Sequence, residues 1–460
     1  MSTMSRLIIV SNRVAPISEG GPAAGGLAVG VYDALRETGG MWFGWSGGIV
    51  ADDAPTPLLG VEQRGPVTFA TIDLSQRDYA QYYRGFSNAT LWPTLHYRSD
   101  LTQFDRQEYE GYKRVNAWLA QQLLPLLHAD DVIWVHDYHL IPFAEALREA
   151  GVKNRIGFFL HTPFPAAQVF STIPPHADLM RALCSYDLVG LQTIPDLRAF
   201  IDYIEHEAGG SVSEDGVVQA YGRTLAARAY PIGIYPDEIA ELAKAGSTSE
   251  TLESLRKTLT GDKLIVSVDR LDYSKGLLER FRSFENLLER FPAERQRVSF
   301  MQIAPPTRSD VHAYQNIRDQ LESQAGRING RYGEMHWTPV RYIHRQYERH
   351  ILASVFRDAH VGFVTPLRDG MNLVAKEYVA AQDPDDPGVL VLSRFAGAAQ
   401  QMTGALIVNP LDIEGMAEAL VEALHMPLAE RQARYEDMMS HLRSDNVSAW
   451  RDAFLGDLKR

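Results

Sequence analysis

The sequence predicts an α/β protein built from two doubly wound parallel-sheet domains. Short apolar runs typical of buried strands alternate with amphipathic helical patterns, and polar residues follow the strands. The chain of 460 residues is longer than one typical domain. We place the junction at the end of the segment ARAYPIGIYPDEI, and expect a first domain over residues 1–238 and a second over residues 239–445.

Composition narrows the class of protein. The hydrophobic fraction of 45% and the charged fraction of 22% are typical of a globular protein. A net charge of −13 argues against a nucleic-acid partner, because no basic stripe is available to neutralise phosphates. The single cysteine, Cys184, cannot form an internal disulfide, which fits the cytoplasm. We see no signal peptide and no apolar run approaching about 18 residues, so we expect no membrane association.

The first strand is predicted at Leu7–Val10 and is followed by a glycine-rich segment. Gly25 and Gly26 open an amphipathic helix after this strand. A glycine loop between a strand and a helix is weak evidence for phosphate binding by itself. Arg13 follows the strand at its carboxyl end, where ligands bind in open α/β sheets.

Aromatic residues are dense in the next part of the chain. Trp42 lies in MWFGWSGGIV, and Tyr83 and Trp92 lie in YYRGFSNATLWP. Aromatic side chains beside polar neighbours suit a sugar-binding wall. A hydrophobic core under a long loop is an equally good explanation.

Two further strands end in histidine. DDVIWVHDYHL ends in His136, Asp137 and His139, and NRIGFFLHTPFP ends in His161. The paired histidines of the first motif suggest a metal, but no third ligand at a matching spacing accompanies them. We therefore expect no metal site and no cofactor.

The second series of strands begins at residue 262. KLIVSVDRLDYSKG leads to Arg270 and Lys275, and RVSFMQIAPPTR ends in Arg308. The intervening helix, LLERFRSFENLLERF, has an apolar face. Either cation alone is explained by a surface ion pair, whereas two cations after one strand suit a diphosphate leaving group.

Residues 361–382 form the segment around which the chain is organised. A buried strand, 361–364, leads through a tight loop into a helix from about Met371. Backbone N–H groups at the start of a helix bind anions and hydroxyls. Asp369 in the loop and Glu377 in the helix add carboxylates that suit a sugar nucleotide. An ordinary strand-to-helix turn with solvated charges is the alternative.

The segment DPDDPG follows this helix and contains a DxD pattern. We interpret the segment as a loop.

The motifs together resemble glycosyltransferase family 20. They include SNRVAP, GGLAVG, WFGWSG, YYRGFSNATLWP, VHDYHL, FFLHTPFP, VDRLDYSKG, QIAPPTR and TPLRDGMNLVAKEYVAAQ, and they run from about residue 6 to the C-terminus. The resemblance implies the glycosyltransferase-B architecture, in which two Rossmann-like domains face each other across a cleft. It also implies transfer of glucose from UDP-glucose to glucose 6-phosphate, giving α,α-trehalose 6-phosphate with retention. We expect the C-terminal helix, 446–460, to pack back on the first domain.

The resemblance also assigns roles to residues. The expected catalytic residues are Arg270, Lys275, His161 and Asp369. The expected donor-binding residues are Gly25, Gly26, His161, Arg270, Lys275, Tyr347, Asp369, Gly370, Met371, Asn372, Leu373, Val374 and Glu377. The expected acceptor-binding residues, for glucose 6-phosphate, are Arg13, Trp42, Tyr83, Trp92, Asp137 and Arg308. A homo-oligomer is a further expectation, although no motif carries it.

Three other functions fit the same scaffold less well. A glucosylglycerol-phosphate synthase or a pseudoglycosyltransferase would differ in the acceptor residues, all of which fit glucose 6-phosphate here. A UDP-sugar 2-epimerase would not explain SNRVAP or YYRGFSNATLWP. A non-enzymatic sugar-phosphate sensor should lack one of Arg270, Lys275 or Glu377. The base of the donor stays open between UDP, which we favour, and GDP or ADP.

Overall fold

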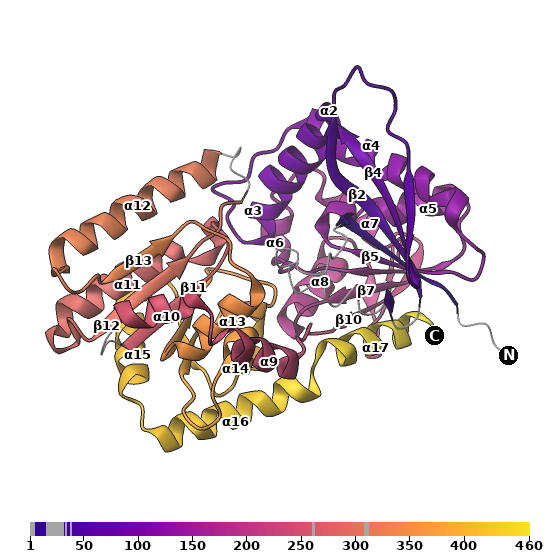
Figure 1. Cartoon of the computed structure of the whole chain (residues 1–460). Helices are drawn as coiled ribbons and strands as arrows, with labels where there is room; N and C mark the ends of the chain where they lie inside the picture. Colours follow the sequence, from indigo (N-terminus) through magenta and orange to yellow (C-terminus); the bar gives the residue numbers. More distant parts are fainter. Residues whose placement is uncertain (1–4, 15–31, 33–34, 37–38, 260–262, 308–311) are drawn as a thin grey trace. The chain divides into compact units, whose positions relative to one another are not determined.

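The computed structural model describes residues 5–14, 32, 35–36, 39–259, 263–307 and 312–460. The chain divides into two compact units (Figure 1). Unit 1 comprises residues 1–231 and 448–460, and unit 2 comprises residues 232–447. The first boundary lies before the expected residue 238 because the intervening residues are bonded within unit 2: Ile232 O accepts from Lys376, and Ile234 O accepts from Val447 N.

Unit 1 contains a ten-stranded sheet with the order β3-β4-β2-β1-β5-β6-β7-β10-β9-β8. Its strands are β1 (Leu7–Arg13), β2 (Gly40–Val50), β3 (Gly60–Arg64), β4 (Val67–Ser75), β5 (Val132–His136), β6 (Arg155–Phe159), β7 (Leu188–Leu191), β8 (Ser211–Val212), β9 (Val217–Ala220) and β10 (Arg223–Ala229). The strands from β4 to β10 are parallel, and β3, β9 and β8 add antiparallel edges. The central strands are almost fully buried, which explains their continuous apolar runs.

Helices flank this sheet, and one of them is unusual. They are α2 (Gln76–Asp78), η1 (Tyr79–Leu91), α3 (Trp92–Leu95), α4 (Arg106–Leu123), η2 (Leu124–Leu126), η3 (Tyr138–Leu140), α5 (Phe143–Glu149), α6 (Ala167–Phe170), α7 (His176–Leu183), α8 (Ile194–His206) and α17 (Val447–Leu458). Helix η1 is a π-helix of 13 residues that carries the YYRGFSNATL motif. π-Helices are rare, and they are frequently found at functional sites.

The C-terminal helix α17 packs on the unit 1 sheet. The Phe454 ring stacks on Trp134 of β5 at 4.7 Å between centroids. Gly157 of β6 and Gly190 of β7 leave room for this ring, since a Cβ at either position would lie within 2.8 Å of Phe454. Glycine in these strands therefore serves close packing rather than a turn.

Unit 2 contains a six-stranded, fully parallel sheet with the order β13-β12-β11-β14-β15-β16. Its strands are β11 (Lys263–Val268), β12 (Val298–Ile303), β13 (Val340–Ile343), β14 (Val361–Val364), β15 (Val389–Ser393) and β16 (Leu406–Val408). Its helices are α9 (Pro236–Gly246), α10 (Glu250–Thr258), η4 (Tyr273–Lys275), α11 (Leu277–Arg290), η5 (Pro292–Glu294), α12 (His312–Tyr332), α13 (Arg349–Asp358), α14 (Leu373–Ala381), η6 (Gly397–Gln400), α15 (Ile413–His425) and α16 (Leu428–Ser444).

The predicted α/β class, with two parallel sheets, is confirmed. The DPDDPG segment lies between α14 and β15 outside any helix or strand, as predicted. Across the described part of the chain, we find no helix with the length and apolar character needed to cross a bilayer.

Candidate functional site

The candidate site in unit 2 lies at the carboxyl ends of two adjacent strands. Strand β11 leads into residues 269–276, and its neighbour β14 leads into residues 365–372. The two loops are bonded to each other, because Leu367 N donates to Ser274 O at 2.8 Å. Gly276 adopts φ +66°, and a Cβ there would lie 2.3 Å from Thr365 O. Only glycine allows the loops to approach so closely at this φ.

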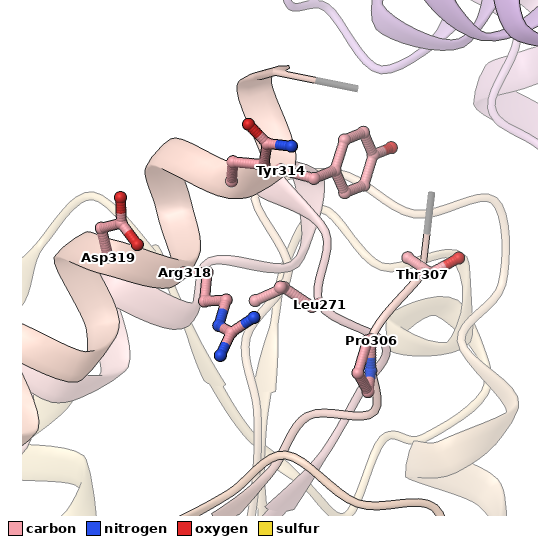
Figure 2. A pocket seen from close by; sticks show the side chains of 7 residues that line it. Leu271, Pro306, Thr307, Tyr314, Arg318 and Asp319 are labelled. Atoms are coloured by element: carbon pink, nitrogen blue, oxygen red, sulfur yellow. The ribbon is translucent and has the colours of Figure 1, made fainter. Parts of the chain in front are cut away.

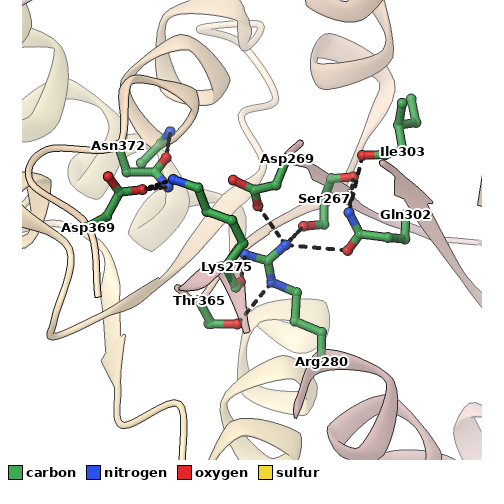
Figure 3. Close-up of polar contacts among 10 residues, drawn as sticks. Ser267, Asp269, Lys275, Arg280, Gln302, Ile303, Thr365, Asp369 and Asn372 are labelled. Carbon is green, nitrogen blue, oxygen red and sulfur yellow. Dashed lines mark hydrogen bonds and ion pairs between the residues drawn. The ribbon is translucent and has the colours of Figure 1, made fainter. Parts of the chain in front are cut away.

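A buried arginine holds this junction together (Figure 3). Arg280 of α11 is 0% exposed. Its guanidinium donates to Asp269 at 2.7 Å, to Thr365 Oγ1 at 3.1 Å and to Lys275 O at 2.9 Å. It also donates to Ser267 Oγ and Gln302 Oε1. One side chain thus ties together β11, β12, the end of β14 and the loop that carries Lys275.

The charge of this arginine is matched by one carboxylate. Burial raises the pKa of Asp269, and the positive charge of Arg280 opposes that shift. Neither residue was among the predicted site residues. The spacing of residues in the sequence does give one indication that Arg280 is buried. It lies three residues after Leu277 and four before Phe284, and so falls on the apolar face of its helix.

Lys275 and Asp369 form an ion pair across the two loops (Figure 3). Both side chains are largely buried, at 11% and 14% exposure. Asn372 Nδ2 donates to the same carboxylate oxygen at 3.0 Å. The pair is therefore not a solvated surface pair, which was the alternative that the sequence left open. It places a cation and an anion side by side at the strand ends, where phosphates and sugar hydroxyls bind in α/β folds.

Helix α14 begins two residues later than predicted, at Leu373. Asn372 has φ +76°, outside the helical region, and its Oδ1 caps the helix by accepting from Ala375 N at 3.2 Å. The preceding Gly370 and Met371 are buried in the loop. Leu373 and Val374 lie in the first turn of α14, where backbone N–H groups have no partner within the helix.

Two titratable side chains on α14 have shifted pKa values. Burial raises the pKa of Glu377 to about 6, and Arg349 opposes that shift. Burial lowers the pKa of Lys376 to about 7, and Asp445 opposes it. The Lys376 ammonium donates to Ile232 O and to Gln401 Oε1, both at 2.7 Å, and so ties the helix to these two segments of unit 2.

Two cavities flank the strand ends of unit 2. One, of about 340 Å³, lies beside the loops after β11 and β12 (Figure 2) and is lined by Leu271, Pro306, Thr307, Tyr314, Gln315, Arg318 and Asp319. Tyr314 of this wall donates to Asp272 Oδ2 at 3.3 Å. The other, of about 280 Å³, is mainly apolar and includes Tyr347.

The two predicted arginines of this part of the chain differ in what the structure describes. Arg270 is exposed just after the end of β11, and Arg308 lies outside the described residues.

Unit 1 brings Asp137 and His161 together at the ends of β5 and β6. Asp137 Oδ1 accepts from His161 N at 3.2 Å, and Asp137 has φ +78°, which is uncommon for a non-glycine residue. His136 Nδ1 lies 3.0 Å from His161 Nε2. Burial lowers the pKa of both histidines, that of His161 to about 3. His136 therefore pairs with His161, not with His139.

The other predicted residues of unit 1 differ in accessibility. Arg13 is exposed, and its guanidinium lies against Gly47, where a Cβ would come within 2.8 Å of Nε. Tyr83 of η1 is partly exposed and stacks on His139 at 5.7 Å. Trp92 is buried, and Trp42 is 2% exposed with its indole N–H donating to Ser11 Oγ at 2.8 Å. Trp42 thus lies in the core, and Gly25 and Gly26 lie outside the described residues.

One other cluster has the residue types of a metal site. Within the described ranges, His128, Asp130 and Asp131 place ligand atoms within 4.8 Å of one another. They precede β5 and so lie at the end of the strand away from His136. Asp131 already accepts from Arg6 at 2.7 Å, which accounts for its burial.

The chain is similar to known proteins over nearly its whole length. A family model for glycosyltransferase family 20 matches residues 13–460. The trehalose-6-phosphate synthase of Enterobacter sp. (strain 638) is 53% identical over 457 residues, covering 99% of this chain and 96% of the relative. A UDP-forming α,α-trehalose-phosphate synthase from Burkholderia xenovorans, solved in complex with glucose-6-phosphate, is 70% identical, with a TM-score of 0.96 and coverage of 99% and 100%. An E. coli structure bound with UDP-2-fluoro glucose is 51% identical, with a TM-score of 0.95 and coverage of 99% of each chain.

Replacing Arg280 by Met should destabilise unit 2. The substitution leaves Asp269 buried without its countercharge, which costs on the order of 3–5 kcal/mol in comparable sites. Thermal unfolding of the variant should therefore begin at a clearly lower temperature. Arg282→Met, on the exposed face of the same helix, is the matched control and should change little. Equal melting temperatures for the two variants would contradict a structural role for Arg280.

Proposed function

Because this chain belongs to glycosyltransferase family 20, we propose that it transfers glucose from UDP-glucose to glucose 6-phosphate. The products are α,α-trehalose 6-phosphate and UDP. The relatives match over nearly the whole of both chains. The observation that carries the proposal is the Lys275–Asp369–Asn372 cluster at the ends of β11 and β14.

The donor is assigned to the strand ends of unit 2. Arg270 and Lys275 neutralise the diphosphate as the glycosyl–phosphate bond breaks, and this needs no metal ion. Asp369, with the backbone of Gly370, Met371 and Asn372, holds the glucose. The first turn of α14 and Glu377 hold the nucleoside, with the Glu377 carboxylate accepting from the ribose hydroxyls.

The acceptor is assigned to unit 1 together with Arg308. Arg13 and Arg308 grip the phosphate of glucose 6-phosphate, while Tyr83, Trp92 and Asp137 contact the sugar. His161 contacts the donor glucose near its 6-hydroxyl. The buried position of Trp42 supports an indirect role in acceptor binding. Its hydrogen bond to Ser11 holds β1, the strand that carries Arg13.

We assign a retaining mechanism in which the leaving phosphate takes the proton from the attacking hydroxyl. The protein then contributes positioning and charge stabilisation rather than a nucleophile. The support is chemical: the histidine at the site is neutral, and Asp369 is already paired with Lys275.

The single cysteine, Cys184, is buried, which fits a cytoplasmic location. Assembly into a homo-oligomer stays a prediction that sedimentation can check.

The reaction is tested by UDP release from UDP-glucose, with and without glucose 6-phosphate, in EDTA. We expect release that depends on glucose 6-phosphate and survives EDTA. Release only from GDP- or ADP-glucose would overturn the base assignment. No release with any of these donors would overturn the acceptor assignment, and glycerol 3-phosphate and cyclitol phosphates would be tested next.

Arg270→Ala should lower turnover by roughly 100-fold or more, the usual loss when one donor to a developing anion is removed. Arg282→Ala removes the same charge from the far side of α11 and should leave kcat unchanged. Steady-state kinetics of the two variants measure the difference. Near wild-type turnover of Arg270→Ala would contradict its role at the diphosphate.

Donor binding should weaken as the pH falls through about 6, the pKa of Glu377. Above this pH the carboxylate accepts from both ribose hydroxyls, and below it the added proton removes one acceptor site. His161 does not titrate in this range because burial lowers its pKa to about 3. Calorimetric titration with UDP-glucose, without acceptor, measures the change. Glu377→Gln should bind more weakly but without this pH dependence; an unchanged pH dependence would contradict the assignment.

A further inference from the structure

The two neighbouring histidines of unit 1 form a bonded pair whose geometry is set by the sheet. His136 ends β5 and lies opposite Phe159 of β6, and His161 follows two residues later. Residues two apart along an extended chain project to the same face, so His161 points toward the side of His136. The rings are tilted by 25° with centroids 5.3 Å apart, and a 3.0 Å contact joins His136 Nδ1 to His161 Nε2.

Both rings are neutral near pH 7, because burial lowers the pKa of each, and His161 lowers the pKa of His136 further. A neutral imidazole carries one N–H and one bare nitrogen. A single hydrogen therefore lies between the rings, and its position decides which nitrogen of His161 is protonated. If His136 donates, the hydrogen of His161 is on Nδ1; if His161 donates, it is on Nε2 and Nδ1 is bare.

The surroundings of His136 favour His136 as the donor. Its Nε2 is buried and has no hydrogen-bond partner among the described residues. The indoles packed on this ring, Trp134 at 4.6 Å and Trp450 at 6.4 Å, carry N–H donors and no acceptor. A buried N–H without an acceptor is rarer in proteins than a bare acceptor. The hydrogen of His136 therefore belongs on Nδ1, in the contact with His161.

The backbone of His161 is held by the next residue of the same strand end. Asp137, which follows β5, accepts from His161 N and has a positive φ. The last residue of β5 and the residue after it thus contact the ring and the backbone of His161. Strain of this kind is retained where the surrounding structure fixes a functional geometry.

We propose that His136 is a positioning residue that holds His161 as its Nδ1–H tautomer, so that His161 donates a hydrogen bond to an oxygen of the donor glucose. The tautomer is inferred from the surroundings of His136 alone, whereas the contact with glucose rests on the proposed function. His136 is too deeply buried to touch a substrate, at 0% exposure, and it acts through His161.

Neutron crystallography of the deuterium-exchanged protein tests the tautomer directly. We expect deuterium on Nδ1 of both His136 and His161, and none on Nε2 of either. Deuterium on His161 Nε2 would overturn the proposal. This measurement needs neither substrate nor activity, so it stands even if the proposed reaction fails.

Kinetics of two variants test the consequence for the reaction. His136→Leu removes the donor, and kcat/KM for UDP-glucose should fall roughly 10- to 100-fold, as when a partner that orients a functional histidine is lost. His136→Asn places an amide N–H near the former Nδ1 and should recover most of this loss. The KM for glucose 6-phosphate should be unchanged in both.

Equal losses in His136→Leu and His136→Asn, at equal melting temperatures, would overturn the positioning role. If His136→Leu does not fold, the positioning role is tested by comparing kcat/KM of His136→Asn with that of the wild type, and the tautomer is tested by the neutron map. Absence of transfer by the wild-type protein would instead contradict the proposed function, and would leave the tautomer to the neutron map.

Discussion

The buried guanidinium of Arg280 is the constraint on which the unit 2 site depends. A charge removed from water is tolerated only when its donors and its charge are matched. Arg280 meets this condition with Asp269, Thr365, the carbonyl of Lys275 and two polar side chains from β11 and β12. The arginine therefore fixes the relative positions of the strand ends and the loops that leave them.

The residues assigned to substrate follow from that junction. Lys275 precedes the glycine at which the β11 loop touches the β14 loop, and Asp369 lies on the β14 loop itself. Their ion pair is held before any substrate arrives, so little reorganisation is needed when charge develops on a leaving diphosphate. In unit 1, a buried polar group likewise holds a site residue, since His136 and Asp137 fix His161. In both units a fully buried side chain, Arg280 or His136, contacts a residue that we assign to substrate binding.

The sequence predicts the fold better than it predicts the contacts that the assigned site residues make. Continuous apolar runs ended by polar residues identify the parallel strands. A strand that is buried on both faces has apolar residues throughout, rather than the alternating apolar and polar residues of a strand with one exposed face. Lys275, Asp369 and His161 are recognisable from motifs at those strand ends. The burial of Arg280 is not, because a charged residue within an amphipathic helix is normally assigned to solvent. The same limit applies to Trp42, since an indole in the core and an indole at a binding wall have the same local pattern.

The most direct test of the account is a crystal structure of the protein with UDP and glucose 6-phosphate. The account predicts the diphosphate within hydrogen-bond distance of Lys275 Nζ and Arg270, the ribose on Glu377, and the sugar phosphate on Arg13. The Arg280 contacts should be unchanged from those described above. A diphosphate bound away from the ends of β11 and β14 would contradict the central claim.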